Sequence, residues 1–169
     1  SSPLRLVVAG GWDLREANLW RRAYAAGICE QVIITGYIPR DELLRLYAGA
    51  AVVCVPSIYE GFGMPIAEAM ACGVPVVASD RGAMREVAGG CAVLVDPEDG
   101  GSIAAGLARA LDDGALRADC VRRGRDRARA FTWIPSSATP STVERPDSGL
   151  GQSMTFGITL VCTASSTSR

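Results

Sequence analysis

Hydrophobic and polar positions follow two alternating patterns along the first 130 residues. Short apolar runs rich in β-branched residues indicate buried strands, and longer segments with apolar residues every three or four positions indicate helices. The short runs predict five strands, at residues 4–9, 32–35, 52–55, 74–78 and 92–95. The longer segments predict helices at residues 14–26, 41–50, 65–70, 83–88, 102–111 and 115–130. Strands that alternate with helices predict an α/β fold, a parallel sheet with helices on both faces.

The strongest functional signal lies between residues 52 and 77. The apolar strand at residues 52–55 is followed by a loop that contains Gly61 and Gly63, and Pro65 stands at a first helical position. The first turn of a helix has backbone N–H groups without intrahelical partners, and glycines let an anion approach the backbone closely. This order of strand, glycine loop and helix predicts a phosphate site.

Two glutamates flank the glycine loop. Glu60 comes just before it, and Glu68 lies one turn into an otherwise apolar helix. A carboxylate that touched phosphate would be repelled, so we interpret both glutamates as acceptors for hydroxyl groups, which a nucleotide sugar offers beside its phosphates. The alternative for Glu68 is an ordinary surface glutamate, but residues 64–72 contain no basic partner for it. The alternative for Glu60 is a loop carboxylate stabilised by the helix dipole, and it stays open.

The segment Glu60-Gly61-Phe62-Gly63-Met64-Pro65-Ile66-Ala67-Glu68 resembles the E-x7-E motif of retaining glycosyltransferases of family 4. The sequence A-M-A-C-G-V-P-V-V-A-S at residues 69–79 continues the resemblance, which extends from Leu4 to Trp133. The family has two Rossmann-like domains that face each other across a cleft. The resemblance implies that residues 1–133 form the C-terminal, donor-binding domain. We expect this domain to be truncated at its N-terminus, because the family's opening strand and its diphosphate-binding Arg and Lys have no counterpart before Leu4.

The resemblance also implies a reaction and a role for each site residue. The family transfers a sugar, here of hexose type, from a nucleoside-diphosphate sugar with retention of configuration, and it needs no divalent metal or other cofactor. The expected catalytic contact to the transferred sugar is Glu60, and Glu68 would bind the ribose hydroxyls. The remaining donor-binding positions are Gly61, Phe62, Gly63 and Met64 at the phosphates and Tyr37 and Ile38 at the base. The acceptor is unknown, and the expected partners are the nucleotide sugar and the missing N-terminal acceptor domain.

Two other functions compete with this interpretation. A non-catalytic module that binds a nucleotide sugar or another partner would fit the missing N-terminal half, and we expect the isolated chain to be inactive as an enzyme. A dinucleotide-dependent oxidoreductase is less favoured, because Ile66 stands where the dinucleotide fingerprint needs glycine or alanine.

Composition excludes several other classes of chemistry. All 17 basic residues are arginine and the chain has no histidine, which excludes a P-loop lysine, a Schiff base, a Ser-His-Asp triad and a histidine-ligated metal. The net charge of −1 gives no argument for nucleic acid, and the arginine-rich segment 122–129 is interpreted as a solvated helix face. The acidic segment 96–99 is interpreted as a turn rather than a metal site. Arg81 and Arg85 could contact phosphate or be exposed, and both alternatives stay open.

The six cysteines include no C-x-x-C pair, so we interpret them as buried thiols of a protein in the reducing cytoplasm. No apolar run reaches the length of a membrane span, and we expect no signal peptide, because none is visible at Ser1. Peripheral association with a membrane stays open.

Composition changes after Trp133. Residues 1–133 contain 7 serines and threonines, whereas residues 134–169 contain 14 in a much shorter segment, with three prolines. We therefore predict one domain at residues 1–133 and a disordered or foreign tail at residues 134–169, with a genuine linker as the alternative. Within the tail, residues 154–162 are the one segment that could form a strand.

Overall fold

A computed structural model describes residues 4–10, 16–131 and 159–164 of the chain. Within them the strands form a single sheet of six, in the order β2-β1-β6-β3-β4-β5. The strands are β1 (Leu4–Ala9), β2 (Val32–Gly36), β3 (Val52–Val55), β4 (Val76–Ser79), β5 (Val93–Val95) and β6 (Thr159–Ala164). The helices are α1 (Glu16–Ala25), α2 (Arg40–Ala48), α3 (Met64–Ala71), α4 (Gly82–Ala88), α5 (Gly100–Asp112) and α6 (Gly114–Ala128), with a short 3-10 helix at Cys29–Gln31.

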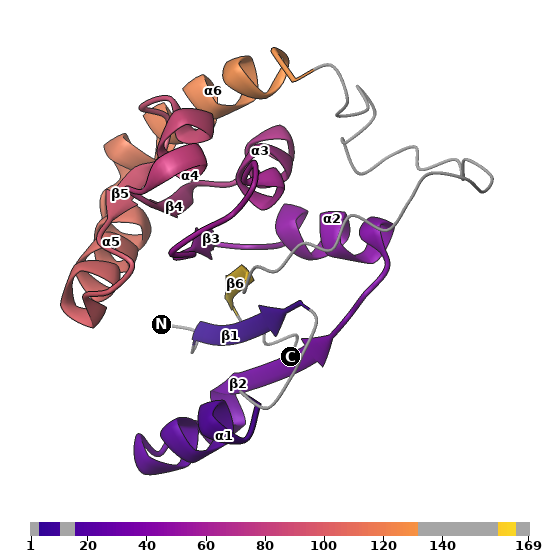
Figure 1. Ribbon diagram of the computed structural model, residues 1–169, viewed down its shortest axis with the longest axis vertical. Coiled ribbons are helices and arrows are strands. Elements are labelled where there is room, and N and C mark those ends of the chain that lie inside the picture. Colours follow the sequence, from indigo (N-terminus) through magenta and orange to yellow (C-terminus); the bar gives the residue numbers. More distant parts are fainter. Residues whose placement is uncertain (1–3, 11–15, 132–158, 165–169) are drawn as a thin grey trace.

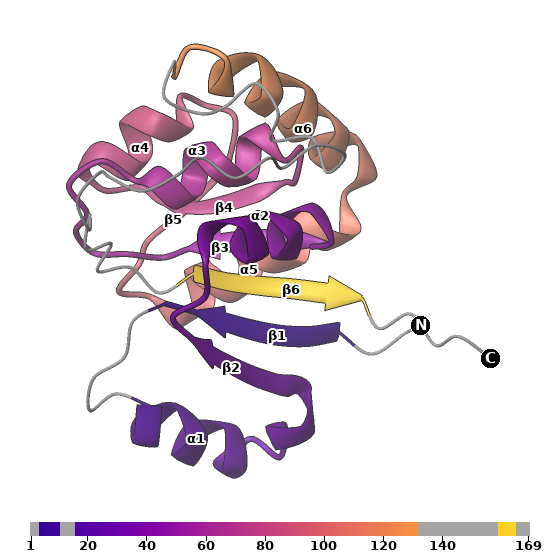
Figure 2. The same cartoon turned by 90° about the vertical axis from the view of Figure 1, so that its right-hand side faces the viewer.

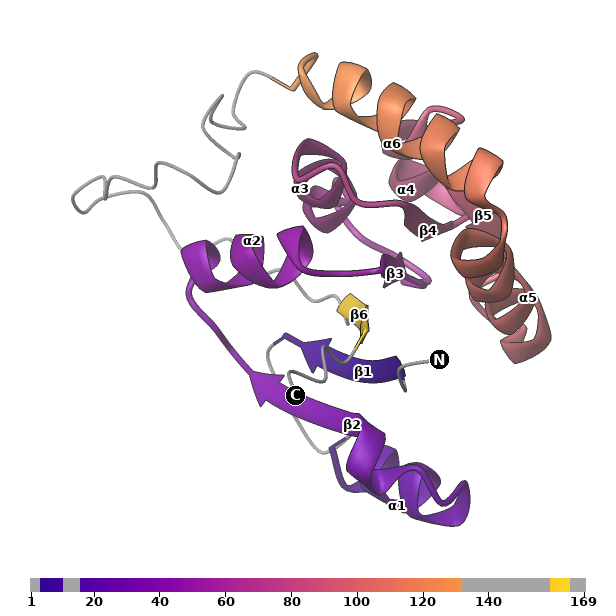
Figure 3. The same cartoon turned by 180° about the vertical axis from the view of Figure 1, so that it is seen from behind.

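The sheet is Rossmann-like and mostly parallel. β1 pairs in parallel with β2, and β3, β4 and β5 form a second parallel set. Helices α2, α3 and α4 lie on one side of the sheet and α5 lies on the other, while α1 lies at the β2 end (Figures 1 and 3). The predicted α/β class, with helices on both faces of a Rossmann-like sheet, is confirmed. The predicted turn between residues 11 and 13 and the start of the first helix lie outside the described residues.

Two apolar clusters form the core, one on each face of the sheet. On one face the largest buried side chains are Tyr47 of α2, Ile66 and Met70 of α3, and Met84 of α4. On the other face α5 contributes the buried Ala110. All four residues of β3 and all four of β4 are buried, because each strand is covered on both faces. Continuous apolar runs are typical of such strands, which is why the sequence predicted both of them.

The tail contributes a strand to the centre of the sheet, which corrects the expectation that it takes little part in the fold. β6 lies between β1 and β3 and runs antiparallel to both (Figure 2). Val161 is fully buried on one face and Cys162 is buried on the other. The sheet is therefore mixed, not purely parallel. The strand reads T-L-V-C-T-A; β1 pairs with all six of these residues and β3 with three of them, so backbone pairing on both sides holds it in the sheet. The rest of the tail lies outside the described residues.

The helix ends show which polar side chains hold the helices in place. The helix predicted from residue 102 begins two residues earlier, and Asp99 caps it, because its carboxylate accepts from the Gly101 N–H at 2.8 Å. The Ser102 hydroxyl accepts instead from the Asp96 N–H at 3.0 Å.

The arginine-rich face of α6 is only partly solvated. Arg122 and Arg129 form exposed ion pairs on the helix surface. Arg127, in contrast, donates to the carbonyl oxygens of Glu86 and Val87, at the C-terminal end of α4. A cation at that end complements the partial negative charge of the helix. The expectation of a solvated face is therefore wrong for Arg127.

Candidate functional site

The candidate site lies where β3 leaves the sheet and the chain turns into α3. Gly63 caps α3 with φ +86°, a conformation that favours glycine. It is buried against α4, since a Cβ added here would lie 3.7 Å from the Met84 Cα. Pro65 follows within the first helical turn, as expected. The local sequence thus fixes a tight loop whose backbone ends at a helix N-terminus.

Glu60 is held inside this loop. Glu60 is only 9% exposed, and the Ser57 hydroxyl donates a hydrogen bond to the Glu60 Oε1 at 2.6 Å. Burial raises the pKa of the Glu60 carboxyl, and the hydrogen bond from Ser57 partly offsets that rise. Glu60 and Glu68 are the two buried carboxylates in the part of the chain that the structure describes. A costly buried acid in a loop is more typical of a site than of a structural position.

Glu68 is buried on α3 and has a partner that the sequence did not reveal. Arg40, the first residue of α2, places its Nε 3.0 Å from the Glu68 Oε1. Burial raises the pKa of the Glu68 carboxyl, and the Arg40 guanidinium lowers it. The search for a partner within α3 was therefore too narrow, because the cation comes from a neighbouring helix 28 positions away. Glu68 is not the ordinary surface glutamate of the alternative interpretation.

Phe62 anchors the exposed part of the loop to the end of α6. Its ring makes an edge-to-face contact with Phe131, with centroids 5.7 Å apart and an interplanar angle of 86°. The Arg127 guanidinium lies 5.7 Å from the centre of the Phe131 ring. Because Arg127 is also bonded to the end of α4, this chain of contacts joins the loop to two helices. Sequence reasoning missed Phe131, since a contact across almost 70 positions leaves no local pattern.

The loop residues 60–64 lead directly into α3, which carries Glu68, and their roles at a donor stay predictions. Tyr37 and Ile38 follow β2 and lead through Pro39 into α2, so they connect directly to the helix that carries Arg40. The Tyr37 side chain is exposed and Ile38 is half-buried. Their role at a nucleotide base stays a prediction.

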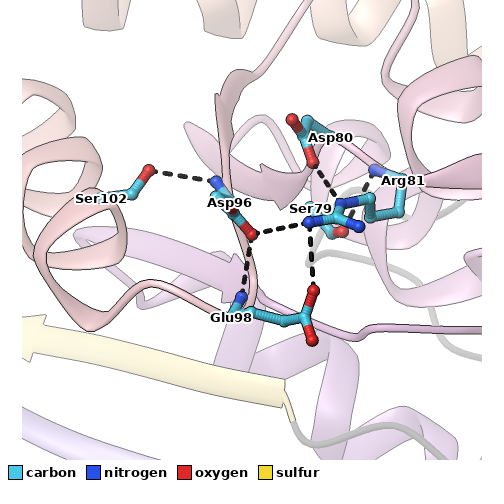
Figure 4. A network of polar contacts seen from close by, with 6 residues as sticks. All are labelled: Ser79, Asp80, Arg81, Asp96, Glu98 and Ser102. Atoms are coloured by element: carbon cyan, nitrogen blue, oxygen red, sulfur yellow. Dashed lines mark hydrogen bonds and ion pairs between the residues drawn. The ribbon is translucent and has the colours of Figure 1, made fainter.

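Arg81 is engaged by acidic side chains (Figure 4). Its guanidinium binds Asp80 at 3.1 Å, Asp96 at 2.9 Å and Glu98 at 3.2 Å. The acidic segment forms the predicted turn, and Asp96 accepts from the Glu98 N–H. Three carboxylates around one guanidinium leave a negative balance, which makes Arg81 a poor phosphate ligand in this arrangement. Arg85 is exposed.

These observations describe a Rossmann-like domain in which a glycine loop, a helix N-terminus and two buried glutamates follow the central strand β3. The sequence model of the family described as glycosyl transferases group 1 matches residues 1–127 of the chain. The chain belongs to this glycosyltransferase family.

Individual relatives support the family assignment and show which share of a related enzyme this chain corresponds to. The chain is 38% identical over 131 residues to the O-antigen chain mannosyltransferase B of Escherichia coli, a match that covers 78% of this chain and 34% of that enzyme. The chain thus spans about a third of that curated relative.

Solved structures agree in fold. The C-terminal domain of a glycosyl transferase group 1 family protein from Francisella tularensis is similar, with a TM-score of 0.62 and 30% identity over 70% of this chain and 63% of that one. Anabaena HepE in complex with UDP gives a TM-score of 0.65 and 25% identity over 73% of this chain and 35% of that one. Both neighbours share the Rossmann-like fold of this chain.

In the part of the chain that the structure describes, the helices are all too short or too polar to cross a membrane.

Proposed function

We propose that the chain is the donor-binding half of a retaining glycosyltransferase of family 4. The whole protein would move a hexose from a nucleoside-diphosphate sugar to an acceptor that the missing N-terminal domain selects. One observation carries the proposal. One buried glutamate precedes a glycine loop and a second lies one turn into the helix that follows the loop, within the segment that matches the family.

The named relatives support donor binding by this part of the protein. The similar structure from Francisella tularensis is described as a C-terminal domain, and Anabaena HepE is described in complex with UDP. The related enzyme from Escherichia coli is named a mannosyltransferase, which supports hexose transfer. Because the match covers only about a third of the related enzyme, it is consistent with the chain being one domain of a two-domain enzyme. The acceptor domain is therefore part of the proposal.

The proposed roles follow the local geometry. The backbone N–H groups of Phe62, Gly63 and Met64 would donate to the diphosphate, where the helix dipole adds partial positive charge. Glu68 would accept hydrogen bonds from the ribose hydroxyls, and Glu60 would contact the transferred sugar. Charge that develops on the departing nucleoside diphosphate would be stabilised at the same helix start.

Titration calorimetry of UDP and GDP into the 169-residue chain tests these roles. A hydrogen bond to a charged acceptor is worth about 1.5–3 kcal/mol, so Glu68→Ala should weaken nucleotide binding by roughly ten- to a hundredfold. Glu68→Gln keeps an acceptor without the charge and should lose less. Glu60→Ala serves as the matched control, because its proposed partner is the sugar that the bare nucleotide lacks.

Two results would contradict the assignment of roles. Glu68→Ala could bind as tightly as the parent chain, or Glu60→Ala could weaken binding of the bare nucleotide more than Glu68→Ala does. Binding of NAD in preference to UDP and GDP would instead favour an oxidoreductase.

We also propose that the isolated chain transfers no sugar, because half of the cleft is supplied by other residues of the whole protein. Turnover by the purified chain that is lost in Glu68→Ala would overturn this. Transfer by the whole protein should survive EDTA, since the proposed chemistry uses backbone dipoles where other enzymes use a metal. Loss of activity on chelation with rescue by Mg²⁺ or Mn²⁺ would contradict it.

The second candidate is a non-catalytic module that binds a nucleotide sugar or another partner. It uses the same glycine loop and the same buried Glu68, which would hold a nucleotide sugar whether or not the sugar is transferred. Assay of the whole protein with nucleotide sugars separates the two, because a binding module would show affinity without turnover. A cytoplasmic location is part of the proposal and is supported by the six cysteines, all of which are free thiols in the structure.

A further inference from the structure

Arg40 and Glu68 form an ion pair in which the carboxylate is buried and the arginine is half exposed to solvent. The Glu68 side chain is 6% exposed, whereas the Arg40 side chain is 47% exposed. The pair joins the first turn of α2 to the middle of α3, two helices that lie on the same face of the sheet (Figure 3). The buried carboxylate is therefore held by a cation that itself reaches the surface.

A second contact fixes the two helices beside each other. One turn beyond Arg40 and one turn beyond Glu68, the Cys72 thiol lies 3.7 Å from the Leu44 carbonyl oxygen and donates to it. Two contacts at matching turns hold α2 and α3 in a fixed register. The Arg40 guanidinium is thus set at Glu68 by the packing of its helix.

The surroundings of Glu68 show how much depends on that guanidinium. Helix α3 packs against α2, α4, α6, β3 and β4. Just after α3, burial and, to a smaller extent, the Glu68 charge raise the pKa of the Cys72 thiol to about 11. From α6, the Arg125 side chain lies against Gly73, and from α4 the apolar Met84 faces Gly63. Among the described residues, Arg40 is the cation hydrogen-bonded to Glu68.

We infer that Arg40 is a positioning residue: it fixes the orientation and the negative charge of Glu68 so that the carboxylate can accept hydrogen bonds from the hydroxyl groups of a bound nucleoside. The inference rests on the proposed function and adds a residue to its site. A carboxylate has about four lone-pair sites, and the single bond from Nε to Oε1 leaves acceptor capacity for the ligand. Arg40 follows the predicted base segment at Tyr37 and Ile38 after one residue, Pro39, and would therefore lie near the same ligand.

Carbon-13 NMR of glutamate-labelled chain measures the effect without any ligand. The Glu68 carboxyl signal is assigned by its loss in Glu68→Gln and is titrated in the parent, Arg40→Ala and Arg40→Lys. We expect a higher Glu68 pKa in Arg40→Ala, because burial then acts without the guanidinium, and partial restoration in Arg40→Lys. Arg45→Ala is the matched control, because Arg45 lies on α2 and pairs with Asp41 rather than Glu68. An unchanged Glu68 pKa in Arg40→Ala would overturn the inference.

UDP titration across about pH 5 to 8 links the pair to binding. Without its guanidinium, Glu68 is protonated at the acid end and is a weaker acceptor, so Arg40→Ala should weaken UDP binding by about tenfold there. The difference from the parent should narrow as the pH rises and Glu68 ionises in both. Arg40→Lys should recover part of the affinity, and Arg45→Ala should bind like the parent. A uniform loss at every pH would indicate a merely structural role and would contradict the inference.

The outcomes separate the inference from the function beneath it. A parent chain that binds neither UDP nor GDP would refute the proposed function, and the role of Arg40 in binding would fall with it. A parent that binds, with Glu68→Ala weakened and Arg40→Ala unaltered in affinity and in Glu68 pKa, would refute the inference alone. If Arg40→Ala does not fold by its amide spectrum, Arg40→Gln keeps a donor without charge and is expected to show the same raised Glu68 pKa.

Discussion

The two halves of the sheet are built in different ways. We call β3, β4 and β5 with their connecting helices the β3–β5 half, and β1 and β2 the β1–β2 half. The β3–β5 half is one continuous segment of chain, and β3 and β4 are buried throughout. The β1–β2 half is paired with it through β6, which comes from the far end of the chain. The two glutamates and the glycine loop lie on the half whose structure is local, and Arg40 is supplied by α2, which connects the halves.

This difference teaches where the site gets its rigidity. The strand, loop and helix of the site are adjacent in sequence, and longer-range contacts from Arg40 to Glu68 and from Phe131 to Phe62 then hold them in place. The β1–β2 half depends on one long-range strand, β6; Ile33 of β2 is exposed, as are Trp20 and Tyr24 on the neighbouring α1. We expect mutations to separate the two halves in the following order of effect.

The largest effect should come from β6. Val161 is fully buried and lies opposite Val7 of β1 and Val53 of β3. Val161→Asp places a charge between the halves and should lower the free energy of unfolding by about 3 kcal/mol or more. Urea denaturation measures this loss, and amide exchange should rise more in β1 and β2 than in β4. Thr163→Asp, at a half-buried position of the same strand, should cost less; equal stability of all three proteins would show that β6 does not join the halves.

The next effect tests packing within the β3–β5 half. A Cβ added at Gly106 of α5 would lie 2.4 Å from the Val95 Cγ1 and 3.3 Å from the Val77 Cγ1. Gly106→Ala should therefore destabilise the chain by about 1–3 kcal/mol through overpacking. The control is Gly100→Ala at the start of the same helix, where an added Cβ meets no atom within 4 Å. A Gly106→Ala chain as stable as this control would mean that α5 packs less closely than described.

A gain in stability is expected at Glu60. Because burial raises the pKa of its carboxyl above 4.5 in the folded chain, the folded state binds the proton more tightly than the unfolded state does. This contribution is complete below pH 4.5 and is lost as the pH rises through the raised folded pKa. Glu60→Gln should thus unfold at higher temperature than the parent at neutral pH and should lose that advantage in acid. Thermal melts over this range measure it, with the exposed Glu42→Gln as control; a less stable Glu60→Gln at neutral pH would contradict the account.

The smallest effect concerns the contact that steadies the glycine loop. Phe131→Leu keeps apolar volume but loses the edge-to-face contact with Phe62, which should cost about 0.5–1.5 kcal/mol. Amide exchange at Gly61 and Gly63 should rise, while exchange in β4 should stay as in the parent. Tyr59→Leu, at a side chain 84% exposed, is the control. If amide exchange in the loop of Phe131→Leu is unchanged, the contact between Phe62 and Phe131 does not steady the loop.

The same contrast explains what the sequence could and could not predict. The apolar run of β3, the glycines of the loop and Pro65 each act on their own neighbours, so the strand, the loop and α3 were predictable together. β6 was missed as a central strand because its composition resembles the polar tail around it and its partners lie about 100 residues away. Arg40 was missed because a charge partner was sought within α3 alone. Ser102 and Asp99 are both good caps by type, and only the geometry of the turn decides between them.

The most direct test of the proposed site compares two helix starts by amide NMR during a UDP titration of the 169-residue chain. At α5, the Asp99 carboxylate already accepts from the Gly101 N–H, whereas Gly63 at the start of α3 has no side chain with which to cap it. The account predicts large, saturable shifts of the Gly63 and Met64 amides and none at Gly101. It also predicts that Glu68→Ala needs more UDP for the same shift. Saturable shifts at Gly101 with Gly63 and Met64 unmoved would contradict the proposed donor site.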